Sequence, residues 1–142
     1  MLHITERIAD PIPCNTSLTL PFDLRQKSRQ RVQLDDGREA ALILPRGVVL
    51  RGGDSLRADD GELIAVRAAV EAVSTASSGD ARLLARAAYH LGNRHVPVQI
   101  GAGWLRYGRD HVLDDMLHGL GLEVRHEESP FEPESGAYQH GD

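Results

Sequence analysis

The stretch YHLGNRHVPVQI, Tyr89–Ile100, decides the fold of the second half of the chain, because a helix ends and a strand begins within it. Upstream, the apolar residues of Leu83–Leu91 recur with the spacing of one helical face. Downstream, the alternating apolar residues of Val96–Ile100 are typical of a strand. We expect Gly92 or Asn93 to end the helix in the left-handed conformation, so that the strand leaves in a new direction.

Around this junction the pattern predicts alternating strands and helices. The predicted elements are a strand at Glu71–Thr75, a helix capped by Asp80, a strand at Val96–Ile100, a partner strand at Trp104–Tyr107, a helix capped by Asp110 and a strand at Leu122–His126. Aspartate is favoured as a cap because its carboxylate accepts hydrogen bonds from the first free N–H groups of a helix. The order βαββαβ is typical of a ferredoxin-like domain, in which two helices cover one face of a four-stranded antiparallel sheet.

The first half of the chain has the pattern of a small β domain. Short apolar runs alternate with turn residues, and Asp36-Gly37 is a strong hairpin signal. The predicted strands are Ser17–Leu20, Arg31–Leu34, Ala40–Leu44, Val48–Leu50 and Leu63–Val66. We therefore predict an α+β protein: a β-rich barrel or sandwich, residues 1–69, precedes the ferredoxin-like domain, residues 70–142, which ends in a flexible C-terminal tail.

Composition and charge argue against several classes of protein. The 142 residues carry a formal net charge of −5, which disfavours a nucleic-acid partner because phosphate recognition needs a basic face. No apolar stretch has the length of a membrane span, and the N-terminus lacks the features of a signal peptide. The single cysteine, Cys14, excludes a cysteine-rich zinc site. We expect a cytoplasmic protein without a membrane partner.

Six of the seven histidines lie in residues 70–142, together with all the excess acidic residues. His95 follows a helix end, where a histidine is often a surface or capping residue. Near a two-fold axis, however, this one position would supply two imidazole ligands, and nickel, copper and zinc all accept imidazole. His90 has a simpler interpretation, as a cation that caps the last carbonyl groups of the helix.

The second predicted helix separates two faces. Its apolar face contains Val112, Leu113, Met116, Leu117 and Leu120, and the opposite face contains His111, Asp114, Asp115 and His118. The polar face is either a solvated surface, with His111 paired to Asp115, or a candidate for acid–base catalysis. Adjacent acids on a helix point roughly 100° apart, and no nucleophile motif accompanies them, so we expect no enzyme.

Three unusual strings of this sequence resemble the UreE family of urease accessory proteins. They are YHLGNRHVPVQI, LRYGRDHVLDDMLHGLGLEV and PFEPESGAY, and the likeness runs from Ala81 to Tyr138. The resemblance implies a homodimeric nickel chaperone, with a peptide-binding-like N-terminal domain, that delivers Ni²⁺ for assembly of the urease active site. It implies the urease accessory GTPase and the apo-urease assembly complex as partners, and it leaves a dimer of dimers open.

The resemblance also implies a set of metal ligands. His95 corresponds to the histidine that binds metal together with its dimer mate, and Asp110 and His111 fall in a secondary metal region. Arg109 stands where some members carry another histidine. His140 is a further candidate ligand, on the C-terminal tail, and Zn²⁺ or Cu²⁺ would also suit such a set.

Two other functions stay open at this point. One is a zinc-binding or other metal-dependent hydrolase that uses His111 with Asp114 and Asp115. The other is a peptide-interaction module, in which the N-terminal domain holds a partner peptide and metal binding is incidental.

Overall fold

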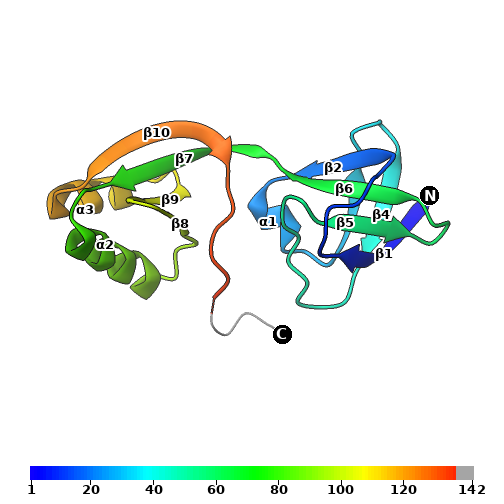
Figure 1. Ribbon diagram of the computed structural model, residues 1–142, viewed down its shortest axis with the longest axis horizontal. Helices are drawn as coiled ribbons and strands as arrows, with labels where there is room; N and C mark the ends of the chain where they lie inside the picture. The colour runs from blue at the N-terminus through cyan, green and yellow to red at the C-terminus, as the bar shows by residue number, and fades with distance from the viewer. Residues whose placement is uncertain (137–142) are drawn as a thin grey trace. The chain divides into compact units, whose positions relative to one another are not determined.

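The computed structural model describes residues 1–136. The chain divides between Ala69 and Val70 into two compact units, which we call unit 1 and unit 2 (Figure 1). Unit 1 is built mainly of strands, whereas unit 2 combines a sheet with two helices, which confirms the predicted α+β fold class. In the described residues, no helix is both long and apolar enough to cross a membrane.

Unit 1 is a six-stranded sheet with one short helix. Its elements are β1 (Leu2–Ile8), β2 (Thr16–Leu20), α1 (Phe22–Arg25), β3 (Arg29–Gln33), β4 (Glu39–Ile43), β5 (Ser55–Ala58) and β6 (Leu63–Ala68). The strand order is β2-β6-β5-β1-β4-β3, with β1–β4 and β2–β6 parallel and the other neighbours antiparallel. The Asp35 N–H donates to the Ser17 carbonyl oxygen at 2.9 Å, which joins the two ends of the sheet into a nearly closed barrel.

Aliphatic side chains fill the interior of this barrel, because alternate residues of each strand point inward. The buried residues include Ile4, Leu18, Val32, Leu42, Leu56 and Ile64. Arg25 is also fully buried, and its Nε and Nη1 donate to the carbonyl oxygens of Leu20 (3.0 Å) and Leu50 (3.1 Å). A buried cation is tolerated here because its donors are hydrogen-bonded.

The prediction of a strand at Val48–Leu50 is wrong. The Leu50 N–H donates to the Arg25 carbonyl oxygen, and the Leu50 carbonyl accepts from the Arg25 side chain. The α1 segment therefore takes the backbone groups that a neighbouring strand would need. Conversely, β1 and β5 form although neither was predicted, because β1 pairs with a distant strand, with Leu2 opposite Ala40.

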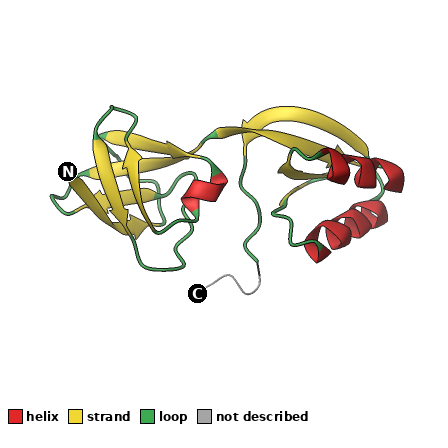
Figure 2. Ribbon diagram, turned by 180° about the vertical axis from the view of Figure 1, so that it is seen from behind, coloured by secondary structure: helices red, strands yellow, loops and turns green. Residues whose placement is uncertain are grey.

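Unit 2 has the predicted βαββαβ order. Its elements are β7 (Val70–Ser77), α2 (Ala81–Asn93), β8 (Gln99–Gly101), β9 (Trp104–Gly108), α3 (His111–Leu120) and β10 (Glu123–Pro130). The sheet order is β10-β7-β9-β8 and every neighbouring pair is antiparallel. Both helices lie on one face of this sheet (Figure 2).

The core of unit 2 forms where the apolar faces of the helices meet the sheet. Leu91 of α2 and Leu117 of α3 are fully buried in one cluster with Leu105 and Tyr107 of β9. Val112 departs from the predicted apolar face, because its side chain is 52% exposed. The face of α3 that packs on the sheet is thus narrower than the apolar face that the sequence predicts.

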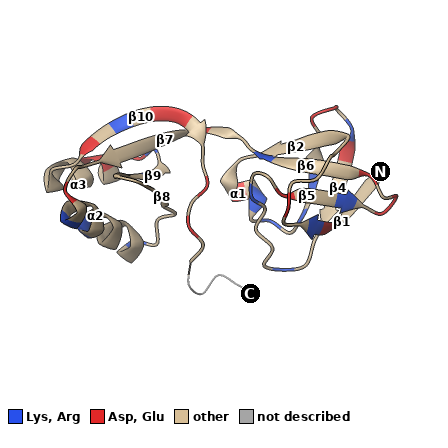
Figure 3. Cartoon of the chain, in the orientation of Figure 1, with Lys and Arg blue, Asp and Glu red and all other residues tan. Residues whose placement is uncertain are grey.

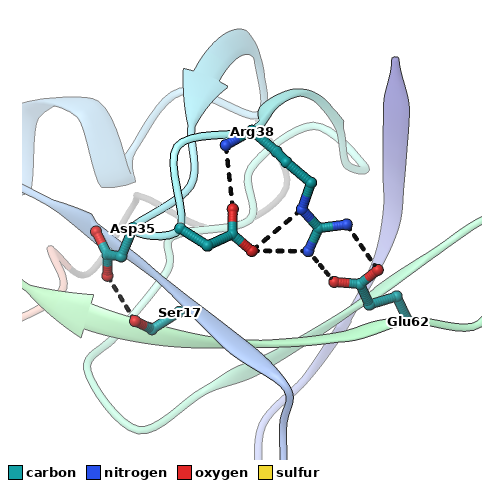
Figure 4. Close-up of polar contacts among 5 residues, drawn as sticks. Ser17, Asp35, Arg38 and Glu62 are labelled. Carbon is teal, nitrogen blue, oxygen red and sulfur yellow. Dashed lines mark hydrogen bonds and ion pairs between the residues drawn. The ribbon is translucent and has the colours of Figure 1, made fainter.

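A charged network closes the β3–β4 hairpin of unit 1 (Figure 4). The Arg38 guanidinium donates to Asp36 (Nη2 to Oδ2, 2.8 Å) and forms a two-pronged ion pair with Glu62. These hydrogen bonds from Arg38 hold the pKa of Asp36 down to about 2 and also lower the pKa of Glu62. The neighbouring Asp35 accepts from the Ser17 hydroxyl at 2.6 Å, so the turn is tied to β2 and to Glu62, the residue before β6.

We predict that Arg38→Ala weakens the pH dependence of stability in acid. The pKa of Asp36 is lowered from 3.8 to about 2 in the folded state, so its contribution to stability is complete above about pH 4 and is lost as the pH falls toward 2. Urea unfolding at a series of pH values should show a steep fall in the free energy of unfolding in this window for the wild type and a shallower fall for the variant. Equal slopes would contradict this account of the network.

Candidate metal site

His95 takes an unusual backbone conformation at the end of α2. Its φ is 58°, the one positive φ among the non-glycine residues that the structure describes. The His95 N–H donates to the Gly92 carbonyl oxygen at 3.0 Å, and the Val96 N–H donates to the Leu91 carbonyl oxygen at 3.1 Å. These two bonds form a Schellman motif, which has His95 at its left-handed position.

The prediction that Gly92 or Asn93 ends the helix in the left-handed conformation is therefore wrong. The helix continues through both residues, and Arg94 is its C-cap, with a φ of −92°. The bonds to the carbonyl groups of Leu91 and Gly92 place the left-handed residue at position 95. Histidine tolerates this conformation better than a bulky β-branched residue does. The imidazole of His95 is exposed.

The sheet topology brings the C-terminus of α2 and the N-terminus of α3 to one end of unit 2. Val73 near the start of β7 lies opposite Gly108 at the end of β9, and α3 starts at His111, shortly after Gly108. Gln99 at the start of β8 pairs with Arg106 of β9, so the chain enters β8 from this same end. His95, which precedes that entry by four residues, therefore shares this end with His111. We call it the ligand end.

Asp110 caps α3 with one carboxylate oxygen. Its Oδ1 accepts from the N–H groups of Val112 (2.9 Å) and Leu113 (3.2 Å), as the sequence predicts for an N-cap. The two capping bonds use Oδ1, so Oδ2 could coordinate a cation. His111, the first residue of the helix, is exposed beside it.

The sequence pattern indicates a solvated face for Asp114, but the structure shows that its carboxylate is bonded within unit 2. Its Oδ1 accepts from the Tyr107 hydroxyl at 2.7 Å, and its Oδ2 lies 2.7 Å from Nε2 of His126. Burial raises the pKa of Asp114, but the hydrogen bonds from His126 and Tyr107 outweigh it and lower the pKa. Burial, reinforced by the bond to Asp114, raises the pKa of Tyr107. Asp114 therefore pins α3 to β9 and β10 and is committed to structure.

The Tyr107–Asp114–His126 contact was missed at the sequence level. In the helical pattern Asp114 falls on the polar face. His126 lies 12 residues further along the chain, in another element. The only signal for the contact was that alternate residues of β10 must face the helices. The fully buried Ser74 lies on β7 in the same sheet.

The Arg109 side chain is directed to β10. Its Nη2 donates to the Glu127 carbonyl oxygen (3.1 Å) and to Glu128 Oε2 (3.3 Å), and β10 carries both acidic and basic residues (Figure 3). The positive charge of Arg109 is thus partly neutralised, which reduces its repulsion of a cation bound near His111.

Exposed apolar side chains accompany the candidate ligands. Tyr89, in the last part of α2, is 67% exposed, and Val112, next to His111, is 52% exposed. Val70, at the start of β7 and so at the same end of the sheet, is 62% exposed. Single exposed apolar residues are ordinary, but three at the ligand end give this surface apolar area that another protein surface could bury.

The segment after β10 lies at the ligand end, because Pro130, the last residue of β10, is opposite Val70. Phe131 is only 5% exposed. The Glu132 N–H donates to Gln99 Oε1 at 2.9 Å, and the Glu134 N–H donates to the Val98 carbonyl oxygen at 2.7 Å. The chain after β10 is therefore anchored at Val98, which lies three residues after His95 in the sequence.

Fewer than three candidate ligands converge at any point within residues 1–136. Within residues 1–136, no group of three or more His, Cys, Asp or Glu side chains is arranged to hold a metal ion. His95, Asp110 and His111 share the ligand end without forming one coordination shell. His140, the fourth predicted ligand, lies outside the described residues.

Comparisons with known proteins cover both units. The family described as "UreE urease accessory protein, N-terminal domain" matches residues 3–69, and the family "UreE urease accessory protein, C-terminal domain" matches residues 71–142. Similar proteins, each called "Urease accessory protein UreE", include one from Alkalilimnicola ehrlichii that is 62% identical and covers 97% of this chain and 85% of its own length. Others are from Enterobacter sp. (58% identical, 97% and 91%) and Pseudomonas putida strain GB-1 (61% identical, 98% and 86%).

We predict that Tyr107→Phe lowers the free energy of unfolding of unit 2 by about 1–2 kcal/mol, because Asp114 loses a hydrogen-bond donor in a partly buried position. Tyr89→Phe is the matched control, since it removes a hydroxyl from a side chain that is 67% exposed. Chemical denaturation of both variants measures the difference. Equal stability of the two variants would show that the Tyr107–Asp114 bond does not hold α3 to the sheet.

Proposed function

The chain belongs to the UreE family of urease accessory proteins, with a role in urease maturation, and from this premise we propose that it is a homodimeric nickel chaperone. In this proposal Ni²⁺ is a cargo, held at the dimer interface and passed to the urease accessory GTPase and the apo-urease assembly complex. The family is one of accessory proteins, not catalytic enzymes.

The observation that carries this proposal is the backbone and the surroundings of His95. Its left-handed conformation presents an exposed imidazole at the ligand end, and the exposed side chains of Tyr89 and Val112 share that end. A second copy that covers these apolar side chains across a two-fold axis would bring its own His95 near the first, since a two-fold interface uses the same surface on both subunits. Two neutral imidazoles then face one ion, as Ni²⁺ prefers.

Three further groups are proposed as auxiliary ligands. Asp110 has one carboxylate oxygen outside its capping bonds, and His111 is exposed beside it. His140 follows the anchored Glu134 by six residues, so an extended chain of this length reaches at most about 20 Å. That reach would allow His140 to approach an ion held by His95. The same ligand set would also accept Zn²⁺ or Cu²⁺.

An exposed site with few fixed ligands suits delivery better than storage. Ligands on a surface and on a terminal segment can be replaced one at a time by those of an acceptor, whereas a closed rigid shell would retain its ion. Structural metal sites differ in this respect, because they surround the ion completely.

The contacts of Asp114 speak against the alternative of a metal-dependent hydrolase. Both of its carboxylate oxygens are engaged, by Tyr107 and His126, and Asp115 points roughly 100° away on the helix. The adjacent acids therefore do not form a pair that could activate water.

The test of the proposal is nickel titration of variants at position 95. His95→Gly and His95→Asn remove the imidazole but suit the left-handed backbone, since glycine and asparagine both adopt positive φ readily. Wild-type protein should bind about one tight nickel ion per dimer, as a site on a two-fold axis requires, and both variants should lose it while staying folded. Calorimetry measures the stoichiometry and circular dichroism checks the fold.

His118→Asn is the matched control, because His118 is an exposed histidine at the C-terminal end of α3, away from the ligand end. It should bind nickel as the wild type does. Undiminished tight binding in His95→Gly would reject the assignment of His95.

A further inference from the structure

The strand β3 leaves an unpaired edge on the barrel of unit 1. It is the last strand of the sheet order, and among residues 1–136 it pairs only with β4. The bonds from Leu44 N–H to the Ser28 carbonyl and from Leu34 N–H to the Arg38 carbonyl show that even-numbered residues face β4. The Asp35 N–H points the other way, toward Ser17 of β2, and closes the barrel there.

The backbone groups of Arg29, Arg31 and Gln33 therefore point outward along the open part of this edge, because backbone hydrogen-bonding directions alternate along a strand. All three residues are exposed. Beyond Asp35 the edge is covered by β2, so the free length runs from Gln33 back to Arg29. An edge with such free groups can pair with an extended segment of another chain.

Basic side chains without acidic partners in the described residues gather around β3. Lys27, Arg29, Arg31 and Arg46 are exposed, and among residues 1–136 none of the four forms an ion pair (basic residues are blue in Figure 3). Other arginines of unit 1 are paired with acids: Arg7 with Asp54, Arg38 with Glu62 and Arg57 with Glu6. The uncompensated positive charge is thus local, although the whole chain has a net charge of −5.

Two hollows border β3. The larger, of about 720 Å³, has Lys27, Arg29 and Arg46 in its wall and no acidic residue. The second, of about 510 Å³, lies against Arg31 and Gln33 and includes one acid, Glu39. The basic groups come from β3, from the turn before it and from the loop after β4, so they converge on the hollow from three segments.

Arginine on an edge strand also has a simpler explanation, since charge there keeps sheets from pairing by accident. That explanation accounts for Arg29 and Arg31, which lie on the strand. It does not account for Lys27 and Arg46, which lie outside β3 and border the same hollow. Their position favours attraction of a negatively charged partner over simple protection of the edge.

We propose that an acidic, extended segment of a protein of the urease assembly machinery binds here by adding a strand to β3. The backbone of the segment pairs with Arg29, Arg31 and Gln33, and its carboxylates meet the basic side chains around the hollows. This proposal rests on the role of the family in urease maturation and does not depend on the nickel site, which belongs to unit 2.

The charge requirement is tested with full-length Arg29→Glu/Arg31→Glu. Urease activation in cells that carry the urease structural and accessory genes should fall by about tenfold or more, since reversed charge repels an acidic partner. The matched control is Arg67→Glu/Arg82→Glu, which makes the same charge change at two exposed arginines elsewhere, and Arg29→Lys/Arg31→Lys should retain activation. Activation at the wild-type level in the charge-reversed variant would overturn the proposal.

The backbone requirement is tested with Gln33→Pro, which removes an outward N–H without changing charge or a bond to β4. It should impair activation, and an unchanged level would overturn strand addition. Should this variant fail to fold, amide hydrogen exchange of wild-type protein bound to the assembly complex gives the same information: the amides of Arg29, Arg31 and Gln33 should be protected, and unprotected amides would reject the proposal. Nickel titration of every variant should match the wild type, so a failed nickel site and a failed docking edge are told apart.

Discussion

The left-handed backbone of His95 is the constraint on which the rest of unit 2 depends. Two hydrogen bonds, to the carbonyl groups of Leu91 and Gly92, stop α2 and turn the chain toward β8. A glycine would satisfy this geometry without strain, whereas an L-residue costs roughly 1–2 kcal/mol there. Strain of this kind tends to persist where a side chain is needed for function. The exposed imidazole at this cap is the feature on which the proposed nickel site rests.

Side-chain and backbone contacts hold the other elements of the ligand end together. Asp114 accepts from Tyr107 and pairs with His126, which fixes α3 to β9 and β10. With α3 fixed, the N-cap Asp110 and the backbone of His111 are held at the ligand end. The segment after β10 is anchored at Val98 and so begins its course to the C-terminus close to the same turn. Unit 1 is independent of these contacts and offers a different surface, the basic edge of β3.

Sequence reasoning succeeded where local rules decide the structure and failed where distant segments decide it. Helical periodicity and the caps Asp80 and Asp110 located both helices of unit 2, and Asp36-Gly37 located a hairpin. The strands β1 and β5 were missed because their pairing partners lie far away in sequence. The left-handed residue was assigned to Gly92 or Asn93 by preference, while the bond pattern of the helix end selected His95. The candidate ligands were identified from sequence, but a single sequence does not describe the second copy that the proposed nickel site requires.

The proposed sharing of a nickel ion between His95 and its symmetry mate is tested most directly by anomalous diffraction at the nickel absorption edge. Crystals of nickel-loaded, full-length protein should give one strong anomalous peak on a two-fold axis between two subunits, within bonding distance of His95 from each. A principal nickel peak inside one subunit and remote from His95 would contradict the account.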